Sequence, residues 1–372
     1  MSKLPRFLEI GNYPPPLCGW AMETKLVVDQ LRRNGCLCEV LKINENRKVR
    51  SAEYVDVQGG LDYLQKIVRF ATRGYRFHMH VNGESPKGYI LAFLALLVGR
   101  IACRPALLTF HGGFPQTYFP RSRFTLIGFA FKMLFHFAHG IRCDSTEIKR
   151  TIEGYGIGPA KVTAISAFSS QYLNFSQSEL AGEVEEFLAH HHPVFFCYVS
   201  FRPEYRLEVL REAMKLFRIS FPRAGFIWLG FPDKEIPLAG DWVHSWPQEE
   251  QNSLLLLGNL DHDRFLTLLQ RCFACVRTPA CDGVSASVLE ALAMGVPIVA
   301  SENGRRPPGV LTYPQDDAAE LCSKLLEIGK QYEHAPRVPG DITSDDNVQR
   351  IVDWLLSESG FVARQSSSPK YA

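Results

Sequence analysis

Short runs of apolar residues alternate along the chain with longer segments that have one apolar side. The runs Arg6–Ile10 and Cys36–Ile43 are predicted strands, and Trp20–Asn34 between them is a predicted helix. The same alternation recurs as far as the predicted helix Asp316–Gly329. Strands that alternate with helices are typical of parallel sheets, so the pattern predicts an α/β protein with doubly wound sheets.

The alternation is interrupted once, between residues 169 and 192, where polar residues dominate. We therefore predict a first domain over residues 1–168, a linker over 169–192 and a second domain over 193–344. The interruption ends in His190-His191-His192, but side chains adjacent in sequence do not converge on one ion. We expect no metal site there.

Composition narrows the function classes. The chain has 372 residues, enough for two domains, and its net charge of +2 argues against a strong nucleic-acid binder. Its ten cysteines lie at irregular positions, which is typical of a reducing compartment. The residues after Met1 show no signal-peptide pattern, so we expect a cytoplasmic protein.

The stretch from Thr278 to Ser301 carries the clearest chemical signal. Ser285 is a suitable N-cap for a helix that runs to Met294, where Gly295 would end it. Glu290 lies within the apolar surface of that helix, and a buried carboxylate needs a hydrogen-bonding partner. The helix N-terminus, preceded by Asp282-Gly283, is suited to hold an anion.

Four further residues, in three loops, lie where α/β sheets bind ligands, at the carboxyl ends of predicted strands. His111 follows the strand Ala106–Phe110 and precedes two glycines, and Arg202 and Arg206 follow the strand that begins at Val194. Gly19 ends the loop before the first helix. Each has an ordinary alternative: a capping histidine, solvated arginines and a tight turn, respectively.

The aromatic segment 124–141 allows two interpretations. It contains five phenylalanines with basic residues nearby, and Lys132 and the histidines interrupt it too much for a membrane span. It is either a buried helix packed on the first sheet or a helix that rests on an anionic membrane surface.

Taken together, these motifs resemble those of the retaining, metal-independent GT-B glycosyltransferases of family 4. The most specific match is Asp282-x7-Glu290 with the helix and strand after it. Supporting matches are the Gly19 loop, Thr109-Phe-His-Gly112, the Arg202/Arg206 strand end and Gly258-Asn-Leu260. The resemblance implies two Rossmann-like domains that face each other across a cleft, with a C-terminal helix over 345–362 crossing back to the first.

The resemblance also implies a role for each site residue. Glu290 would hold the ribose hydroxyls of a nucleotide, Asp282 would contact the donor sugar, and Leu260 would lie in the nucleotide-base loop. The remaining donor-binding positions are in the helix N-terminus that would receive phosphate: Gly283, Val284, Ser285, Ala286 and Ser287.

The proposed catalytic groups are Asp282 and three further side chains. Arg202 and Arg206 would neutralise the departing diphosphate, and His111 would contact the donor sugar near the reacting carbon. Gly19 would let the first domain close over the diphosphate. Two departures are visible: Asp282 stands where the family more often has glutamate, and Arg206 where lysine followed by glycine is frequent.

These features predict a retaining enzyme that moves a sugar from a nucleoside diphosphate sugar to a glycan or lipid-linked acceptor. Neither a metal nor another cofactor is expected, nor is nucleic acid, and contact with the inner membrane face is a further expected partnership. Two alternatives stay open: a sugar-nucleotide epimerase of GT-B fold, and a catalytically silent protein that binds sugar nucleotides.

Overall fold

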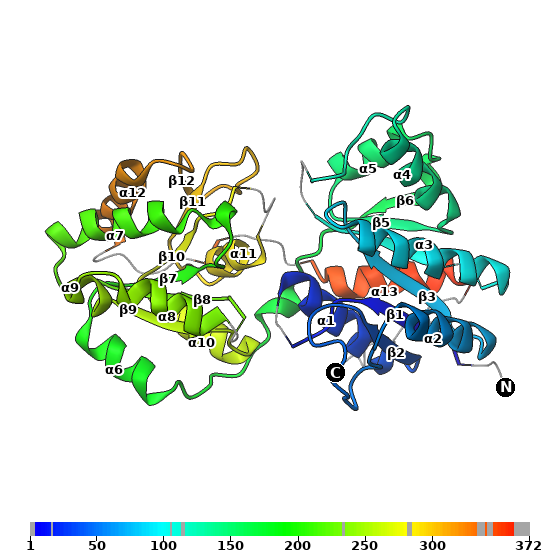
Figure 1. Ribbon diagram of the computed structural model, residues 1–372, viewed down its shortest axis with the longest axis horizontal. Coiled ribbons are helices and arrows are strands. Elements are labelled where there is room, and N and C mark those ends of the chain that lie inside the picture. Colours follow the sequence, from blue (N-terminus) through cyan, green and yellow to red (C-terminus); the bar gives the residue numbers. More distant parts are fainter. Residues whose placement is uncertain are drawn as a thin grey trace, which may run out of the picture. The chain divides into compact units, whose positions relative to one another are not determined.

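The computed structural model describes residues 4–15, 18–104, 106–112, 116–232, 235–280, 285–332, 339–340 and 345–360. The chain forms two compact units, which are coloured along the sequence in Figure 1. The first unit comprises Met1–Pro15, Trp20–Ser169 and Asp345–Ala372, and the second comprises Pro16–Gly19 and Ser170–Ser344.

The first unit is built on a six-stranded sheet with the order β2-β1-β3-β4-β5-β6, in which every neighbouring pair is parallel. Its strands are β1 (Arg6–Gly11), β2 (Leu37–Lys42), β3 (Arg76–Val81), β4 (Leu107–Phe110), β5 (Ile141–Cys143) and β6 (Val162–Ala164). The central strands are buried on both faces, which explains why they read as nearly continuous apolar runs.

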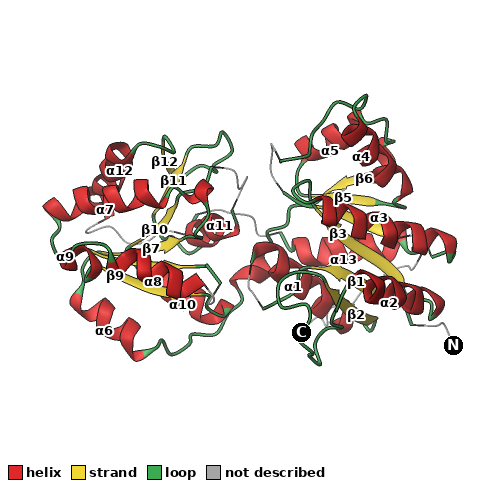
Figure 2. Cartoon of the chain, viewed as in Figure 1, coloured by secondary structure: helices red, strands yellow, loops and turns green. Residues whose placement is uncertain are grey.

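Helices cover both faces of this sheet, as Figure 2 shows. One face packs against α2 (Gly60–Thr72), α3 (Pro86–Ile101), α4 (Leu126–Phe137) and α5 (Thr146–Gly154). The other packs against α1 (Gly19–Arg33) and the final helix α13 (Asn347–Glu358). A short 3-10 turn, η1 (Pro159–Lys161), leads into β6. The final helix thus completes the core of the first unit.

The second unit repeats this plan with the strand order β12-β11-β10-β7-β8-β9, again all parallel. Its strands are β7 (Val194–Tyr198), β8 (Gly225–Leu229), β9 (Leu254–Gly258), β10 (Ala274–Arg277), β11 (Ile298–Ser301) and β12 (Leu311–Tyr313). Two six-stranded parallel sheets with helices on both faces confirm the predicted α/β class.

The helices of the second unit also divide between two faces. One core contains α7 (Leu207–Ser220), α8 (Ile236–His244) and α12 (Ala318–Tyr332). The opposite core contains α6 (Gly182–His190), α10 (His262–Arg271) and α11 (Ala286–Ala293). The short elements are α9 (Gln248–Gln251), η2 (Ser170–Leu173) and η3 (Pro203–Tyr205).

Some boundaries differ from the sequence prediction. The helix predicted over 124–141 is limited to Leu126–Phe137, since the chain turns extended at Ala138. The segment 169–192 contains α6, whose buried Val184 packs into the second unit's core. Among the described helices, none combines the length and the apolar character needed to cross a bilayer.

Candidate functional site

Each sheet has a point where the winding reverses, between β1 and β3 in the first unit and between β7 and β10 in the second. Ligands of open α/β proteins bind at the carboxyl ends of the strands beside such points. In the second unit, Arg277 ends β10 and Arg202 follows β7. In the first, Glu9 lies on β1 and His80 on β3.

The helix α11 forms as the sequence predicts. Ser285 is its N-cap with an extended backbone, and Gly295 beyond its end has φ 68°, the left-handed conformation that glycine favours. The Ser285 hydroxyl lies 2.9 Å from the Ser287 hydroxyl. Because the first N–H groups of a helix lack acceptors within it, this end of α11 can receive an anion.

Glu290 lies on α11 and is 5% exposed, as the apolar surface around it predicts. Its Oε1 lies 3.4 Å from Nε2 of His262, the first residue of α10. Within the described part of the chain, no other side-chain hydrogen bond of this carboxylate is found. Glu290 therefore keeps the capacity to accept hydrogen bonds from a ligand. Sequence reasoning missed His262, although it lies two residues after Leu260.

Several predicted donor-binding residues have definite positions. Leu260 packs against the core beside α10 and α11. The carbonyl of Gly19 accepts a hydrogen bond from the Tyr172 hydroxyl at 3.1 Å. A Cβ added at Gly19 would lie 3.4 Å from the Ala286 Cβ, so the backbone approaches α11 closely there. The predicted residues Asp282, Gly283 and Val284 lie outside the described residues.

Both predicted arginines engage acidic neighbours. The Arg202 side chain is 61% exposed and lies 3.4 Å from Glu204. Arg206 has a left-handed backbone, with φ 48°, and its Nε donates to Asp316 at 2.6 Å. These ion pairs reduce the positive charge that the two arginines present to a ligand, and their role toward a diphosphate stays a prediction.

A third arginine at the same edge is buried. Arg277 is 6% exposed, its Nη1 donates to the Tyr198 carbonyl at 3.2 Å, and its guanidinium lies 4.7 Å from the Tyr198 ring centroid. It also lies 5.3 Å from the ring centroid of Tyr205. Sequence reasoning overlooked Arg277, although a cation that ends an otherwise apolar strand is a recognisable signal.

His111, at the end of β4, is 6% exposed and is held from several sides. Its ring centroid lies 4.5 Å from that of Trp20, and its Nδ1 lies 3.6 Å from Oδ2 of Asp144. Gly112 has φ 109° and donates its N–H to Asp144 at 3.1 Å. A Cβ at Gly112 would lie 2.0 Å from Nε2 of Gln116, so only glycine fits there.

Behind His111 lies a buried hydrogen-bonded network. Its Nε2 is 2.8 Å from Nδ1 of His80, whose Nε2 is 3.0 Å from Oε2 of Glu9. The same carboxylate oxygen lies 2.6 Å from Nδ1 of His78. The Nε2 of His78 lies 2.7 Å from the Thr109 hydroxyl. None of these residues was singled out in the sequence except as part of the His111 motif.

Burial controls the charges in this network. It lowers the pKa of His80 to about 3 and the pKa of His78 well below the ordinary value. It also raises the pKa of Glu9, against the opposing hydrogen bond from His80. For Asp144, burial acts to raise the pKa, but the charges of Arg142 and His111 outweigh it and lower the pKa.

Two overlapping groups of side chains could in principle hold a metal: Glu9, His78 and His80, and Glu23, His80 and His111. Two ligands of a tetrahedral zinc lie about 3.3 Å apart when each is about 2 Å from the ion. The contact of 2.6 Å between Glu9 and His78 has instead the length of a hydrogen bond. We therefore assign these contacts to hydrogen bonds.

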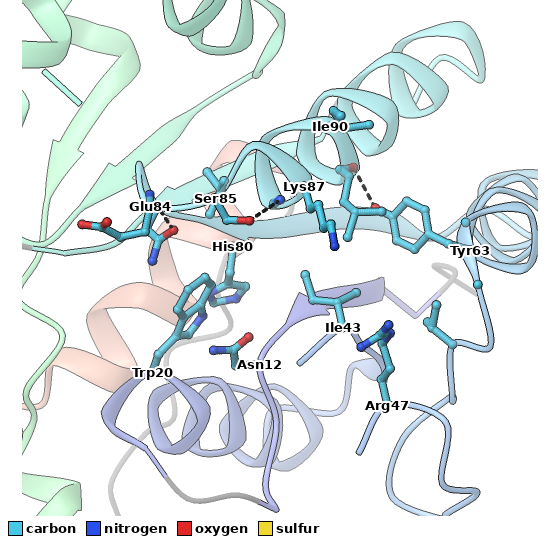
Figure 3. Close-up of a pocket in the computed structure, with 17 residues that line it drawn as sticks. Asn12, Trp20, Ile43, Arg47, Tyr63, His80, Glu84, Ser85, Lys87 and Ile90 are labelled. Atoms are coloured by element: carbon cyan, nitrogen blue, oxygen red, sulfur yellow. Dashed lines mark hydrogen bonds between the residues drawn. The ribbon is translucent and has the colours of Figure 1, made fainter. Parts of the chain in front are cut away.

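The first unit also has a cavity of about 600 Å³ beside β3. Trp20, His80 and Asn12 lie at one end of it, as Figure 3 shows. Lys87 and Arg47 lie on opposite sides of Ile43, and both side chains point toward Ile43. His80 thus connects the buried network to a cavity that has basic side chains.

No protein-family model matches the chain, and no curated protein matches it significantly in sequence. Its structure is similar to that of HepE from Anabaena in complex with UDP-glucose, with a TM-score of 0.62, 14% identity, and coverage of 95% of this chain and 97% of that one. A glycosyltransferase from Rickettsia africae gives a TM-score of 0.63 at 14% identity, covering 95% and 93%. The UDP-GlcNAc 2-epimerase from Methanocaldococcus jannaschii gives 0.60 at 13% identity, covering 94% and 99%. Likeness over nearly whole chains shows that the fold is of the GT-B type, whereas membership of glycosyltransferase family 4 stays a prediction.

Proposed function

We propose that the protein binds a nucleoside diphosphate sugar at the carboxyl edge of the second unit's sheet and acts on that sugar. The observation that carries the proposal is Glu290, a buried carboxylate on α11 whose one described partner is His262 at 3.4 Å. An acceptor of this kind suits the two hydroxyls of a ribose, and the N-terminus of the same helix suits phosphate. Similar structures hold UDP or UDP-glucose, which favours uridine as the base.

Two reactions compete for this site. Epimerisation at C2 of the sugar is favoured by the similar structures, several of which are UDP-GlcNAc 2-epimerases. Retaining transfer to a glycan or lipid-linked acceptor, without a metal, is favoured by the spacing Asp282-x7-Glu290. The structural likeness supports epimerisation at least as well as transfer. A silent sugar-nucleotide-binding protein is the third outcome to test.

One experiment separates the three. The protein is incubated in D₂O with UDP-glucose or UDP-GlcNAc, with and without glycan and polyprenyl-linked acceptors. A C2 epimer that carries deuterium identifies an epimerase, because the reaction exchanges the proton on that carbon. Release of UDP, together with a product in which the sugar is attached to the acceptor with the anomeric configuration of the donor, identifies retaining transfer. Binding of UDP without either product identifies the silent module, and no binding at all refutes the proposal.

For a transferase, we propose that the acceptor binds in the cavity of the first unit. Arg47 and Lys87 would pair with an anionic group of the acceptor, and the apolar Ile43 and Leu91 would contact its remainder. This arrangement fits an acidic glycan or a lipid-linked phosphate better than a neutral sugar.

We also propose that the protein contacts an anionic membrane surface through an apolar patch at the start of α4. The patch consists of Phe124, Leu126, Ile127 and Phe129, which are 85%, 85%, 40% and 53% exposed. The guanidinium of Arg123 lies 5.0 Å from the centroid of the Phe124 ring, so positive charge borders the patch. Apolar side chains with basic neighbours are suited to anionic lipid.

A further inference from the structure

Glu9, His80 and His111 form a continuous line of hydrogen bonds that ends at the candidate catalytic histidine. The distances are 3.0 Å from Glu9 Oε2 to His80 Nε2 and 2.8 Å from His80 Nδ1 to His111 Nε2. The planes of the His80 and His111 rings are nearly parallel, at 11°, and their centroids are 5.1 Å apart, so the two rings meet edge to edge. Both ring nitrogens of His80 are therefore occupied, one by each neighbour.

This geometry limits where protons can lie. A neutral imidazole donates from one nitrogen and accepts at the other. If Glu9 is ionised, His80 donates to it from Nε2, its Nδ1 is an acceptor, and His111 must donate from Nε2. Asp144 lies on the Nδ1 side of His111 at 3.6 Å, which favours a proton there too. In this arrangement His111 is an imidazolium.

A second arrangement contains the same number of protons. Glu9 is protonated and donates to His80 Nε2, His80 donates from Nδ1, and His111 accepts at Nε2 while keeping its Nδ1 proton. The first arrangement becomes the second when the His111 Nε2 proton moves to His80 Nδ1 and the His80 Nε2 proton moves to Glu9. Two N–H bonds break, one N–H and one O–H bond form, and no proton enters or leaves.

We propose that Glu9, His80 and His111 form a proton relay in which Glu9 and His111 share one proton through His80. The charge of His111 can then change without proton exchange with solvent. Burial makes this useful, because Glu9 is 0% exposed and His80 is 1% exposed. Glu9 and His80 are thus positioning residues that act through His111.

The surrounding charges allow either arrangement. Asp144 and Glu23 lie on the His111 side and favour the imidazolium, while Arg142 pairs with both of these acids and offsets them. On its other side, Glu9 Oε2 lies 2.6 Å from Nδ1 of His78. Burial, with a contribution from the charge of Glu9, raises the pKa of the Cys38 thiol and keeps it uncharged. Burial lowers the pKa of His80, so it favours a neutral His80 ring, which both arrangements contain. Burial also raises the pKa of Glu9 and so favours the arrangement in which Glu9 is protonated.

The use of the relay rests on the proposed function. An anion bound beside His111 would favour the imidazolium, and the relay would supply its proton from Glu9. A departing or reacting anion would then meet a positive charge that is already in place.

The relay is tested by ¹⁵N NMR of the full chain labelled at histidine, after treatment with a chelator. In the wild type, His80 should show shifts averaged between its two tautomers. Glu9→Gln should give His80 a single tautomer, because an amide cannot take up the second proton. Thr109→Val alters the network on the other side of His78 and should retain the wild-type averaging.

Three results would overturn the relay. One is a single His80 tautomer that is the same in the wild type and in Glu9→Gln. Another is the loss of averaging in Thr109→Val, which would indicate a purely structural network. The third is a spectrum that changes on chelation, which would assign the cluster to a metal.

Addition of UDP separates the relay from the proposed function. An anion that binds beside His111, tested with inorganic phosphate, should move the wild-type averages toward the His80 Nε2–H tautomer and a charged His111, and Glu9→Gln should not show this shift in His80. UDP should shift the resonances of His262, which lies 3.4 Å from Glu290. If UDP leaves every histidine resonance unchanged, including those of His262, while His80 is averaged in the free protein, nucleotide binding is refuted and the relay stands.

Discussion

Glu290→Ala should weaken UDP binding strongly. A hydrogen bond to a charged group contributes about 1.5–3 kcal/mol, so two ribose hydroxyls bound to one carboxylate contribute at least ~3 kcal/mol. A loss of ~3 kcal/mol raises the Kd about 150-fold. Because Glu290 is 5% exposed, solvent screens these bonds little, and the estimate needs no reduction for exposure.

The assay is isothermal titration calorimetry with UDP, with thermal unfolding recorded for each variant. Glu290→Gln keeps one acceptor oxygen without the charge and should raise the Kd about tenfold, a loss of ~1.4 kcal/mol. The control is Glu320→Ala on α12, which removes a half-exposed carboxylate 3.5 Å from Lys324 in the same unit. This control should change the Kd less than about twofold.

The ribose assignment is refuted if Glu290→Ala binds UDP as tightly as the wild type and melts at the same temperature. A fall in melting temperature with unchanged affinity would show instead that Glu290 serves the fold through His262. The variant His262→Asn further distinguishes a ribose-binding role of Glu290 from a structural one. If Glu290 binds the ribose, His262→Asn should lose much less affinity for UDP than Glu290→Ala, because His262 only orients the carboxylate, at 3.4 Å.

The other predictions concern charge and surface. Arg277→Met should raise the Kd for UDP about tenfold in calorimetry, because a buried cation at the ligand edge is lost. Lys215→Ala on α7, where the side chain is 44% exposed and paired with Glu212, should change the Kd less than about twofold. Burial lowers the pKa of Lys42 in the folded protein to about 8, whereas a lysine of the unfolded chain has a pKa of about 10.4. Between these two pH values, unfolding therefore takes up a proton, and the free energy of unfolding rises with pH. Lys42→Met should therefore be more stable than the wild type at pH 8 in denaturant melts, with an advantage that shrinks toward pH 10; a constant difference contradicts this reasoning. Phe124→Ser should reduce co-sedimentation with phosphatidylserine vesicles at least threefold, while Ile219→Ser, 76% exposed on α7, should not; equal effects contradict the membrane proposal.

The parts of the site that local sequence signals specify were predicted well. Ser285 caps α11, Gly295 ends it with a positive φ, and Glu290 is buried within its apolar surface. Each of these features depends on residues within one or two helical turns, so capping rules and hydrophobic periodicity are enough to predict it.

Features that depend on distant pairs could not be predicted in this way. Arg206 binds Asp316 across 110 positions in the chain, and Glu290 meets His262 across 28. The sequence provides the charged side chains but not the packing of α10 against α11 or the approach of the loop after β12. The arginine pair was therefore assigned to a ligand without its acidic partners.

The buried network shows what a closer use of strand periodicity could have found. His78 and His80 alternate with Phe77 and Met79 on β3, and a period of two places both histidines on one face of the sheet. A neutral histidine pair on one face of a buried strand needs polar partners from the neighbouring strands. The register supplies them: Glu9 of β1 lies opposite His78.

Register also explains why the partners could not be named in advance. His80 lies opposite Thr109 of β4, so the histidine face of β3 is flanked by β1 on one side and β4 on the other. In a parallel sheet, neighbours are joined by crossovers of a dozen or more residues, and the order β1-β3-β4 is not encoded in any local pattern. Once that order is known, the polar residues of three strands meet at the point where the winding reverses, and the line from Glu9 to His111 follows. A carboxylate on a central buried strand is costly unless such a line exists, so Glu9 is the residue from which the network could have been inferred.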